Sequence, residues 1–168
     1  MATFQIVTPI AAPIEVCFDL ARDIHFHIRS LEGTGERAVA GRTSGLIGLG
    51  ESVTWEARHL GVRQRFTAEV TALDRPAYFR DVMTAGAFRS FTHDHRFETR
   101  DGGTVMTDEI EFRSPLRPLG WLVDYLFMAG YLRRLLDGRC QAIKLEAELV
   151  AQNPTEPLYG LRSQERAP

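Results

Sequence analysis

The sequence predicts an α+β protein in which a curved antiparallel sheet of six to seven strands wraps around one long C-terminal helix. Three observations lead to this fold class. The middle of the 168-residue chain alternates apolar and polar residues, which is typical of strands with one buried face. Compact turns join these alternating segments, and a long amphipathic segment follows the last of them. A sheet with one apolar face needs a cover, and this helix is the only large element available to provide it.

The first forty residues predict one strand, two short helices and a second, short strand. Alternation over residues 4–8 indicates an edge strand that ends at Pro9. Apolar residues at helical spacing then predict a helix over 14–22, and a second short helix is expected over 24–31. Closely spaced glycines surround a short strand near 37–40.

Residues 51–59 and 62–70 form a predicted hairpin. Each segment has an apolar and a polar face, and a register that pairs His59 with Val62 makes the two apolar faces coincide. The same register brings together two further cross-strand pairs, Trp55 with Phe66 and Val53 with Ala68.

Three more strands are expected, over 78–83, 87–99 and 104–113. The last two flank Asp101-Gly102, and Asp-Gly between alternating segments is a strong hairpin signal. The predicted sheet is therefore antiparallel almost throughout.

The long helix is expected to begin at Ser114-Pro115 and to run to about Leu149. The tail, 151–168, is polar and lacks periodicity, which predicts disorder. The chain is thus expected to hold one ligand-binding domain, 1–150, followed by that tail. A strongly bent sheet that closes on one helix leaves space between the two, so an enclosed and mostly apolar pocket is predicted.

Composition excludes several classes of function. The formal net charge is −2, from 20 basic and 22 acidic residues, which gives no electrostatic reason to expect nucleic acid as a partner. The apolar run Leu116–Leu136 is interrupted by charges, so no stable membrane insertion is expected. The N-terminus lacks a signal-peptide pattern, and the two cysteines, Cys17 and Cys140, favour free thiols over one disulfide. These features predict a cytoplasmic protein and leave its oligomeric state open.

The segment 91–97 holds the most informative residues. Two histidines, His93 and His95, share the apolar strand face with Phe91 and Phe97. Extending the hairpin back from its turn gives the cross-strand pairs Phe97 with Met106, His95 with Asp108, His93 with Ile110 and Phe91 with Phe112. A carboxylate therefore lies opposite an inner histidine, within hydrogen-bonding reach.

Four interpretations of this His–Asp pair stay open. It can be a satisfied polar contact within a core, or it can line a pocket and orient a polar group of a ligand. It can perform acid–base catalysis, with Asp108 raising the basicity of His95. It can also bind a metal through the two histidines, with Asp108 or His59 as third ligand.

Other polar residues carry weaker signals. His25 and His27 point in different directions on their helix and are expected at the surface near the pocket mouth. Asp81 and Arg89 are expected to form a surface ion pair across a hairpin. Arg58 is a further candidate for a catalytic role, although its strand position favours an outward side chain.

The common cofactor and nucleophile signatures are absent. The chain has no Gly-x-Gly-x-x-Gly motif, phosphate-binding loop, Gly-x-Ser-x-Gly elbow or Cys-x-x-Cys pair. No cofactor and no metal are therefore expected, and binding is favoured over catalysis.

Four segments resemble the helix-grip superfamily, which includes START lipid-transfer domains, birch-pollen-allergen-type proteins, ubiquinone-binding proteins and aromatic polyketide cyclase/dehydrases. They are APIEVCFDL at 12–20, GESVTW at 50–55, HDHRF at 93–97 and GTVMTD at 103–108. The resemblance covers about 4–149. It implies an internal cavity for an apolar or aromatic ligand, but the superfamily shares a cavity and not a reaction.

Two functional hypotheses follow. The first is binding or carriage of a hydrophobic small molecule such as a lipid, quinone or polyketide-like compound. The second is a cyclase or dehydratase in which His95 and Asp108 are catalytic and a free imidazole nitrogen faces the cavity. A weaker third hypothesis is a partner-binding domain with a filled core. The predicted pocket residues are Trp55, Phe66, Phe91, His93, His95, Phe97, Met106, Asp108, Ile110 and Leu126.

Overall fold

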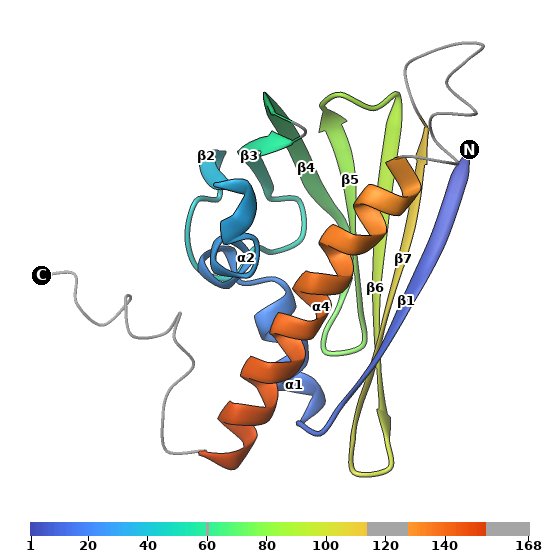
Figure 1. Cartoon of the computed structure of the whole chain (residues 1–168). Helices are drawn as coiled ribbons and strands as arrows, with labels where there is room; N and C mark the ends of the chain where they lie inside the picture. The colour runs from blue at the N-terminus through green and yellow to red at the C-terminus, as the bar shows by residue number, and fades with distance from the viewer. Residues whose placement is uncertain (60, 114–127, 154–168) are drawn as a thin grey trace, which may run out of the picture.

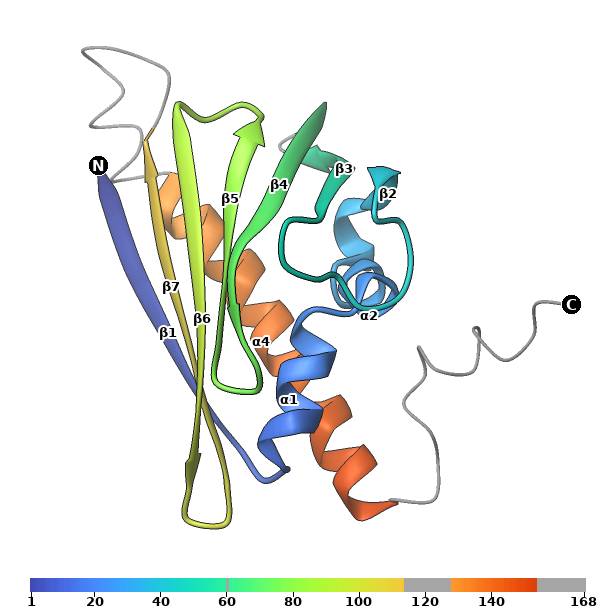
Figure 2. The same cartoon turned by 180° about the vertical axis from the view of Figure 1, so that it is seen from behind.

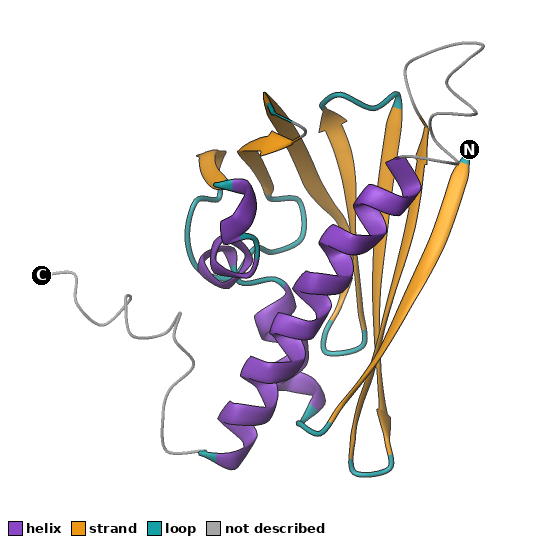
Figure 3. Cartoon of the chain, in the orientation of Figure 1, coloured by secondary structure: helices purple, strands orange, loops and turns teal. Residues whose placement is uncertain are grey.

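The computed structural model describes residues 1–59, 61–113 and 128–153, and it confirms the predicted fold class. Within these residues, a seven-stranded antiparallel sheet carries a long C-terminal helix and two short helices on one of its faces (Figure 3). The strands are β1 (Ala2–Ile10), β2 (Arg37–Gly41), β3 (Ser52–His59), β4 (Val62–Asp74), β5 (Tyr78–Ala85), β6 (Ser90–Arg100) and β7 (Gly103–Arg113). The helical elements are α1 (Ile14–Ala21), α2 (Ile24–Ser30), the 3₁₀ turn η1 (Glu32–Thr34) and α4 (Ala129–Gln152).

The sheet order is β1-β7-β6-β5-β4-β3-β2, so strands β2 to β7 form a meander and β1 closes the far edge. The predicted registers of both hairpins are confirmed: Trp55 pairs with Phe66, and His95 pairs with Asp108. At the β6–β7 turn, Asp101 and Gly102 both have positive φ, 52° and 79°. Asp-Gly tolerates this left-handed backbone, which matches the twist of the flanking strands.

Strand β1 extends further than expected, because it continues through Pro9 to Ile10. The Pro9 carbonyl accepts a hydrogen bond from Lys144 Nζ at 2.5 Å and therefore points away from β7. In an antiparallel strand, the nitrogen of a residue lies on the same side as its carbonyl. The missing N–H of Pro9 thus costs no bond of the β1–β7 ladder, as expected for proline on an edge strand.

Helix α4 crosses the concave face of the sheet diagonally, and α1 and α2 lie beside it (Figure 1). Viewed from behind, α4 lies beyond the sheet (Figure 2). Ile143 and Ala147 of α4 are fully buried, as is Phe18 of α1, and all three belong to the main core. A second cluster forms around Phe91 and Leu132 near the start of α4.

Some predictions concern residues that lie outside those described. They are the first part of the long helix, with Leu126, and nearly all of the tail expected to be disordered.

Cys17 and Cys140 are both buried and free. No helix in the described part of the chain combines the length and apolar character needed to cross a bilayer.

Candidate functional site

A pocket of about 340 Å³ lies between the inner face of the sheet and the helices α2 and α4. Its lining is mostly apolar. Strands β3 to β6 contribute mainly alternate residues, because alternate side chains of a strand point to the same face. Helix α4 contributes a stripe at helical spacing, namely Tyr131, Leu132, Leu135, Leu136 and Arg139.

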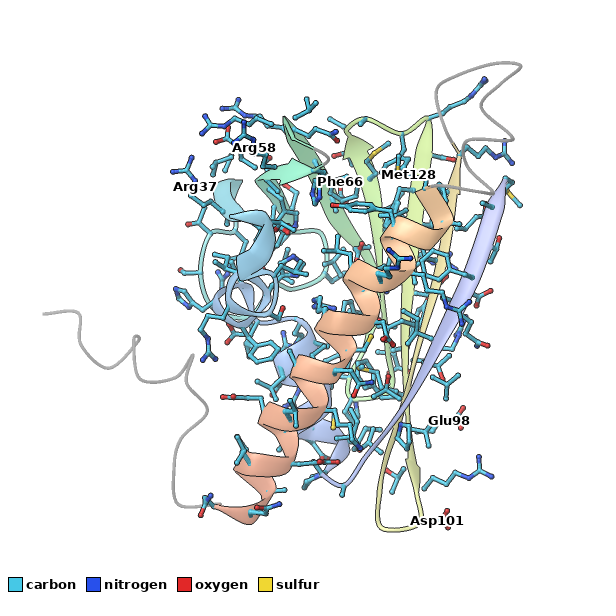
Figure 4. All side chains as sticks on the ribbon, in the orientation of Figure 1. Arg37, Arg58, Phe66, Glu98, Asp101 and Met128 are labelled. Atoms are coloured by element: carbon cyan, nitrogen blue, oxygen red, sulfur yellow. The ribbon has the colours of Figure 1, made fainter. Side chains whose placement is uncertain are left out.

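Five of the predicted pocket residues line this pocket, and they are Trp55, Phe66, Phe91, His93 and His95. Figure 4 shows Phe66 on β4 at the same end of the molecule as Met128, another lining residue that precedes α4. Four other predicted residues are buried but do not line the pocket: Phe97, Met106, Asp108 and Ile110. They pack behind the lining, because they lie further along the same inner face or under its side chains.

The two inner histidines form one polar network with two carboxylates. Nε2 of His93 lies 2.9 Å from Oδ1 of Asp108, and Nδ1 of His95 lies 2.8 Å from the same oxygen. Nε2 of His95 lies 3.1 Å from Oδ2 of Asp81 on β5. Asp108 is completely buried, with Cys140 Sγ donating to its other oxygen at 3.4 Å.

Aromatic stacking holds the two imidazole rings in place. The ring of His95 stacks on Phe79 with centroids 4.0 Å apart, and its centroid lies 3.7 Å from that of His93 with the two planes inclined by 35°. All three rings belong to the β5–β6 part of the pocket wall.

Burial and charge act in opposite directions on these groups. Burial lowers the pKa of His93 below its ordinary value, and the charge of neighbouring His95 lowers it further. Burial alone would lower the pKa of His95, but the charge of Asp108 and the contacts with both carboxylates raise it. Burial would raise the pKa of Asp108, yet the two histidines hold it well below its usual range. These opposite shifts make His95 the more basic of the two rings.

The hydrogen-bond geometry leaves His93 with a ring nitrogen that has no partner among the described residues. An ionised Asp108 can only accept hydrogen bonds, so Nε2 of His93 carries the hydrogen and Nδ1 carries the lone pair. Among the described residues, that Nδ1 atom has no hydrogen-bond partner. Both nitrogens of His95 instead lie against carboxylates. Chemically, His93 can accept a proton or a hydrogen bond from a molecule in the pocket.

The position of Asp81 differs from the one predicted. The expected surface pair of Asp81 with Arg89 is wrong, because Asp81 lies opposite His93 in the register and faces the pocket. Its carboxylate binds His95 instead. The signal in the sequence was its position two residues after Phe79, which places both on the inner face.

His27 corrects a second prediction. Its side chain is only 21% exposed, and its ring stacks on Trp55 with centroids 4.1 Å apart and planes inclined by 13°. Its Nε2 lies 3.2 Å from Glu36, and both residues line the pocket. Asp23 caps helix α2 by accepting from the backbone N–H of Phe26 at 2.9 Å.

His59, which the sequence offered as a possible third metal ligand, does not join the cluster of Asp81, His93 and His95. Its Nδ1 lies 2.7 Å from the hydroxyl oxygen of Tyr131 on α4. Arg139 is buried, and it donates to the carbonyl of Ala21 at 2.5 Å. Arg58 is exposed at the outer edge of the sheet and donates to a turn carbonyl, so it does not take part in this site (Figure 4).

The fold and the pocket together define a helix-grip protein with a mainly apolar site between sheet and helix. Solved structures with this fold include TTHA0849 from Thermus thermophilus, with a TM-score of 0.67 and 20% identity over 84% of this chain and 97% of that one. A START superfamily protein from Mycobacterium smegmatis has a TM-score of 0.66 and 14% identity, over 88% of this chain and 98% of that one. Major latex-like protein 151 from Panax ginseng has a TM-score of 0.62 and 15% identity, over 87% of this chain and 97% of that one.

The chain belongs to the family described as polyketide cyclase / dehydrase and lipid transport, whose model matches residues 1–148. A comparison with curated proteins gave no match. The predicted resemblance is thereby confirmed. Membership associates the protein with hydrophobic ligands or cyclase-like activity, and fold alone does not select between them.

Proposed function

We propose that the protein binds a hydrophobic small molecule of lipid, quinone or polyketide type in the pocket between the sheet and α4. The observation that supports this most directly is the pocket itself. Its volume of about 340 Å³ and its mainly apolar lining with a few polar groups are typical of sites for small molecules. Transfer of an apolar ligand from water into this lining provides the driving force.

The placement of polar groups defines what such a ligand needs. Asp81, His93 and His95 lie on the β5–β6 wall, and Arg139 lies on α4. A ligand with one or two oxygen atoms on an otherwise apolar skeleton can bond to Nδ1 of His93 or Nε of Arg139, whereas a pure hydrocarbon leaves both nitrogens without a partner among the described residues.

One observation favours a second function, a cyclase or dehydratase acting on an enolisable ketone. Nδ1 of His93 has no partner among the described residues while Asp108 contacts its other nitrogen, which is the arrangement of a general base and its orienting carboxylate. In this alternative, Asp108 acts through the histidines because it does not reach the pocket lining.

Native mass spectrometry of the full chain tests the binding function, followed by solvent extraction and identification of anything bound. A stoichiometric apolar compound supports the proposal and identifies the ligand class. If the protein purifies empty, titration with a fluorescent apolar probe is the second measurement. A protein that neither co-purifies with a compound nor binds the probe saturably contradicts the proposal.

The enzyme alternative has its own test. Polyketone substrates are incubated with the wild type, with His93→Gln and with His95→Ala. Turnover that both substitutions abolish, while probe binding persists, supports catalysis. Probe binding without turnover of any substrate contradicts the enzyme alternative and supports binding as the function.

A further inference from the structure

We propose that Asp81, His93 and His95 form a site for a divalent transition-metal cation such as Zn²⁺ on the wall of the pocket. Each residue offers one ligand atom, and these three atoms all lie within 4.8 Å of one another. Nε2 of His95 and Oδ2 of Asp81 are 3.1 Å apart. A tetrahedral zinc site with bonds of about 2.0–2.2 Å places its donors ~3.3 Å apart, so small side-chain rotations complete the site.

The ligand types suit this class of cation. Two imidazoles and one carboxylate form a nitrogen-and-oxygen donor set that zinc and other borderline cations favour over magnesium or calcium. All three residues line the pocket, so the remaining coordination position faces its interior. Three protein ligands with one open position are the arrangement of catalytic rather than structural zinc sites.

Asp108 provides the outer support that such a site requires. A histidine that binds a metal usually holds its second ring nitrogen against a carboxylate or a carbonyl, which fixes the ring. Here one completely buried carboxylate contacts Nε2 of His93 at 2.9 Å and Nδ1 of His95 at 2.8 Å. The contact to His95 is too bent for a hydrogen bond, and Nδ1 is a buried atom without a partner. Rotation of the His95 ring toward a bound cation would let its Nδ1–H point at Asp108 and form this hydrogen bond.

The charges of the cluster also favour a cation. Asp81 and Asp108 carry two negative charges beside two imidazoles that are neutral when they bind a metal. One divalent cation therefore neutralises the cluster. Arg139 of α4 also lines this pocket, and its charge acts on Asp81.

The test is titration of the metal-stripped, tag-free full chain with Zn²⁺ by isothermal calorimetry, supported by visible absorption of the Co²⁺ complex. We expect one Zn²⁺ per chain, and a Co²⁺ spectrum without a thiolate charge-transfer band. Asp81→Asn and His93→Gln each remove one ligand and should weaken binding at least a hundredfold. Asp108→Asn removes only the outer support and should weaken it about 10–100-fold.

The matched control is His25→Gln, which removes a histidine of α2 that does not line the pocket and should leave Zn²⁺ affinity unchanged. Far-ultraviolet circular dichroism of each variant checks that it is folded. Equal affinity of folded Asp81→Asn and wild type overturns the site, as does a thiolate band that assigns the metal to a cysteine. Absence of any Zn²⁺ binding by the wild type overturns the metal site as well. This result would not contradict the proposed binding of an apolar ligand.

Discussion

The imidazole of His27 on α2 stacks on the indole of Trp55 on β3, with ring centroids 4.1 Å apart. This contact joins the helical side of the pocket to the sheet, and the hydrogen bond between His27 and Glu36 at 3.2 Å lies beside it. A histidine in this position responds to pH.

The stability of the protein should fall as the solution is acidified, in part through His27. Burial lowers the pKa of His27 below its ordinary value of 6.5. The unfolded chain therefore binds the proton more readily, and stability falls as the pH drops through 6.5 toward the lower folded value. His27→Gln should reduce the slope of unfolding free energy between pH 7 and 5 by at most about 1.4 kcal/mol per pH unit. Urea denaturation at several pH values measures this, and His25→Gln is the control. An unchanged slope in His27→Gln would contradict the assignment.

Removing the buried carboxylate Asp108 should destabilise the protein strongly. Asp108→Ala leaves two buried imidazoles without their shared partner, and breaking a buried ion pair costs about 3–5 kcal/mol. Chemical denaturation of Asp108→Ala and of Glu98→Ala, an exposed carboxylate on β6, measures the difference. Glu98→Ala should change stability by less than about 0.5 kcal/mol. Similar losses in both variants would show that the network does not stabilise the fold.

Filling the pocket should block ligand binding without unfolding the protein. Ala68 lies on β4 and lines the pocket, so Ala68→Phe places a ring in the space that an apolar ligand needs. The affinity for a fluorescent apolar probe should fall at least about tenfold, which corresponds to ~1.4 kcal/mol. Thr71→Phe adds the same ring at an exposed position of the same strand and should bind the probe normally. Normal binding by folded Ala68→Phe would place the probe elsewhere.

The core contact of α4 should depend on one face of the helix only. Ile143 is completely buried, and Ile143→Ala should cost about 2–5 kcal/mol through lost burial and a residual cavity. Leu145 is 63% exposed on the same helix, so Leu145→Ala should change stability by less than about 0.5 kcal/mol. Thermal and urea unfolding measure both values. A comparable loss in Leu145→Ala would mean that a further surface covers this side of α4.

The registers of both hairpins were predictable because their determinants are local. In each case a short turn joins two alternating segments, and a one-residue slip would turn every apolar side chain outward. The pairs of Trp55 with Phe66 and of His95 with Asp108 follow from that constraint.

The site residues that were missed depend on determinants that are not local. The connection between β5 and β6 is long enough to leave their register undetermined, so the partner of Asp81 could not be derived. The inward face of a helix as short as α2 depends on how it docks against β3, and its own periodicity is too brief to define it.

The order of the elements, the antiparallel sheet, the inner faces of the strands and the opposition of His95 and Asp108 could all be derived from the sequence. They follow from alternation, turn chemistry and chain order, which act between neighbours in the chain. The folded chain was needed to show that Asp81 joins the histidines, that His93 has the free ring nitrogen, and that His27 stacks on Trp55. These contacts arise from the curvature of the sheet and the packing of helices on it, where residues far apart in the chain meet.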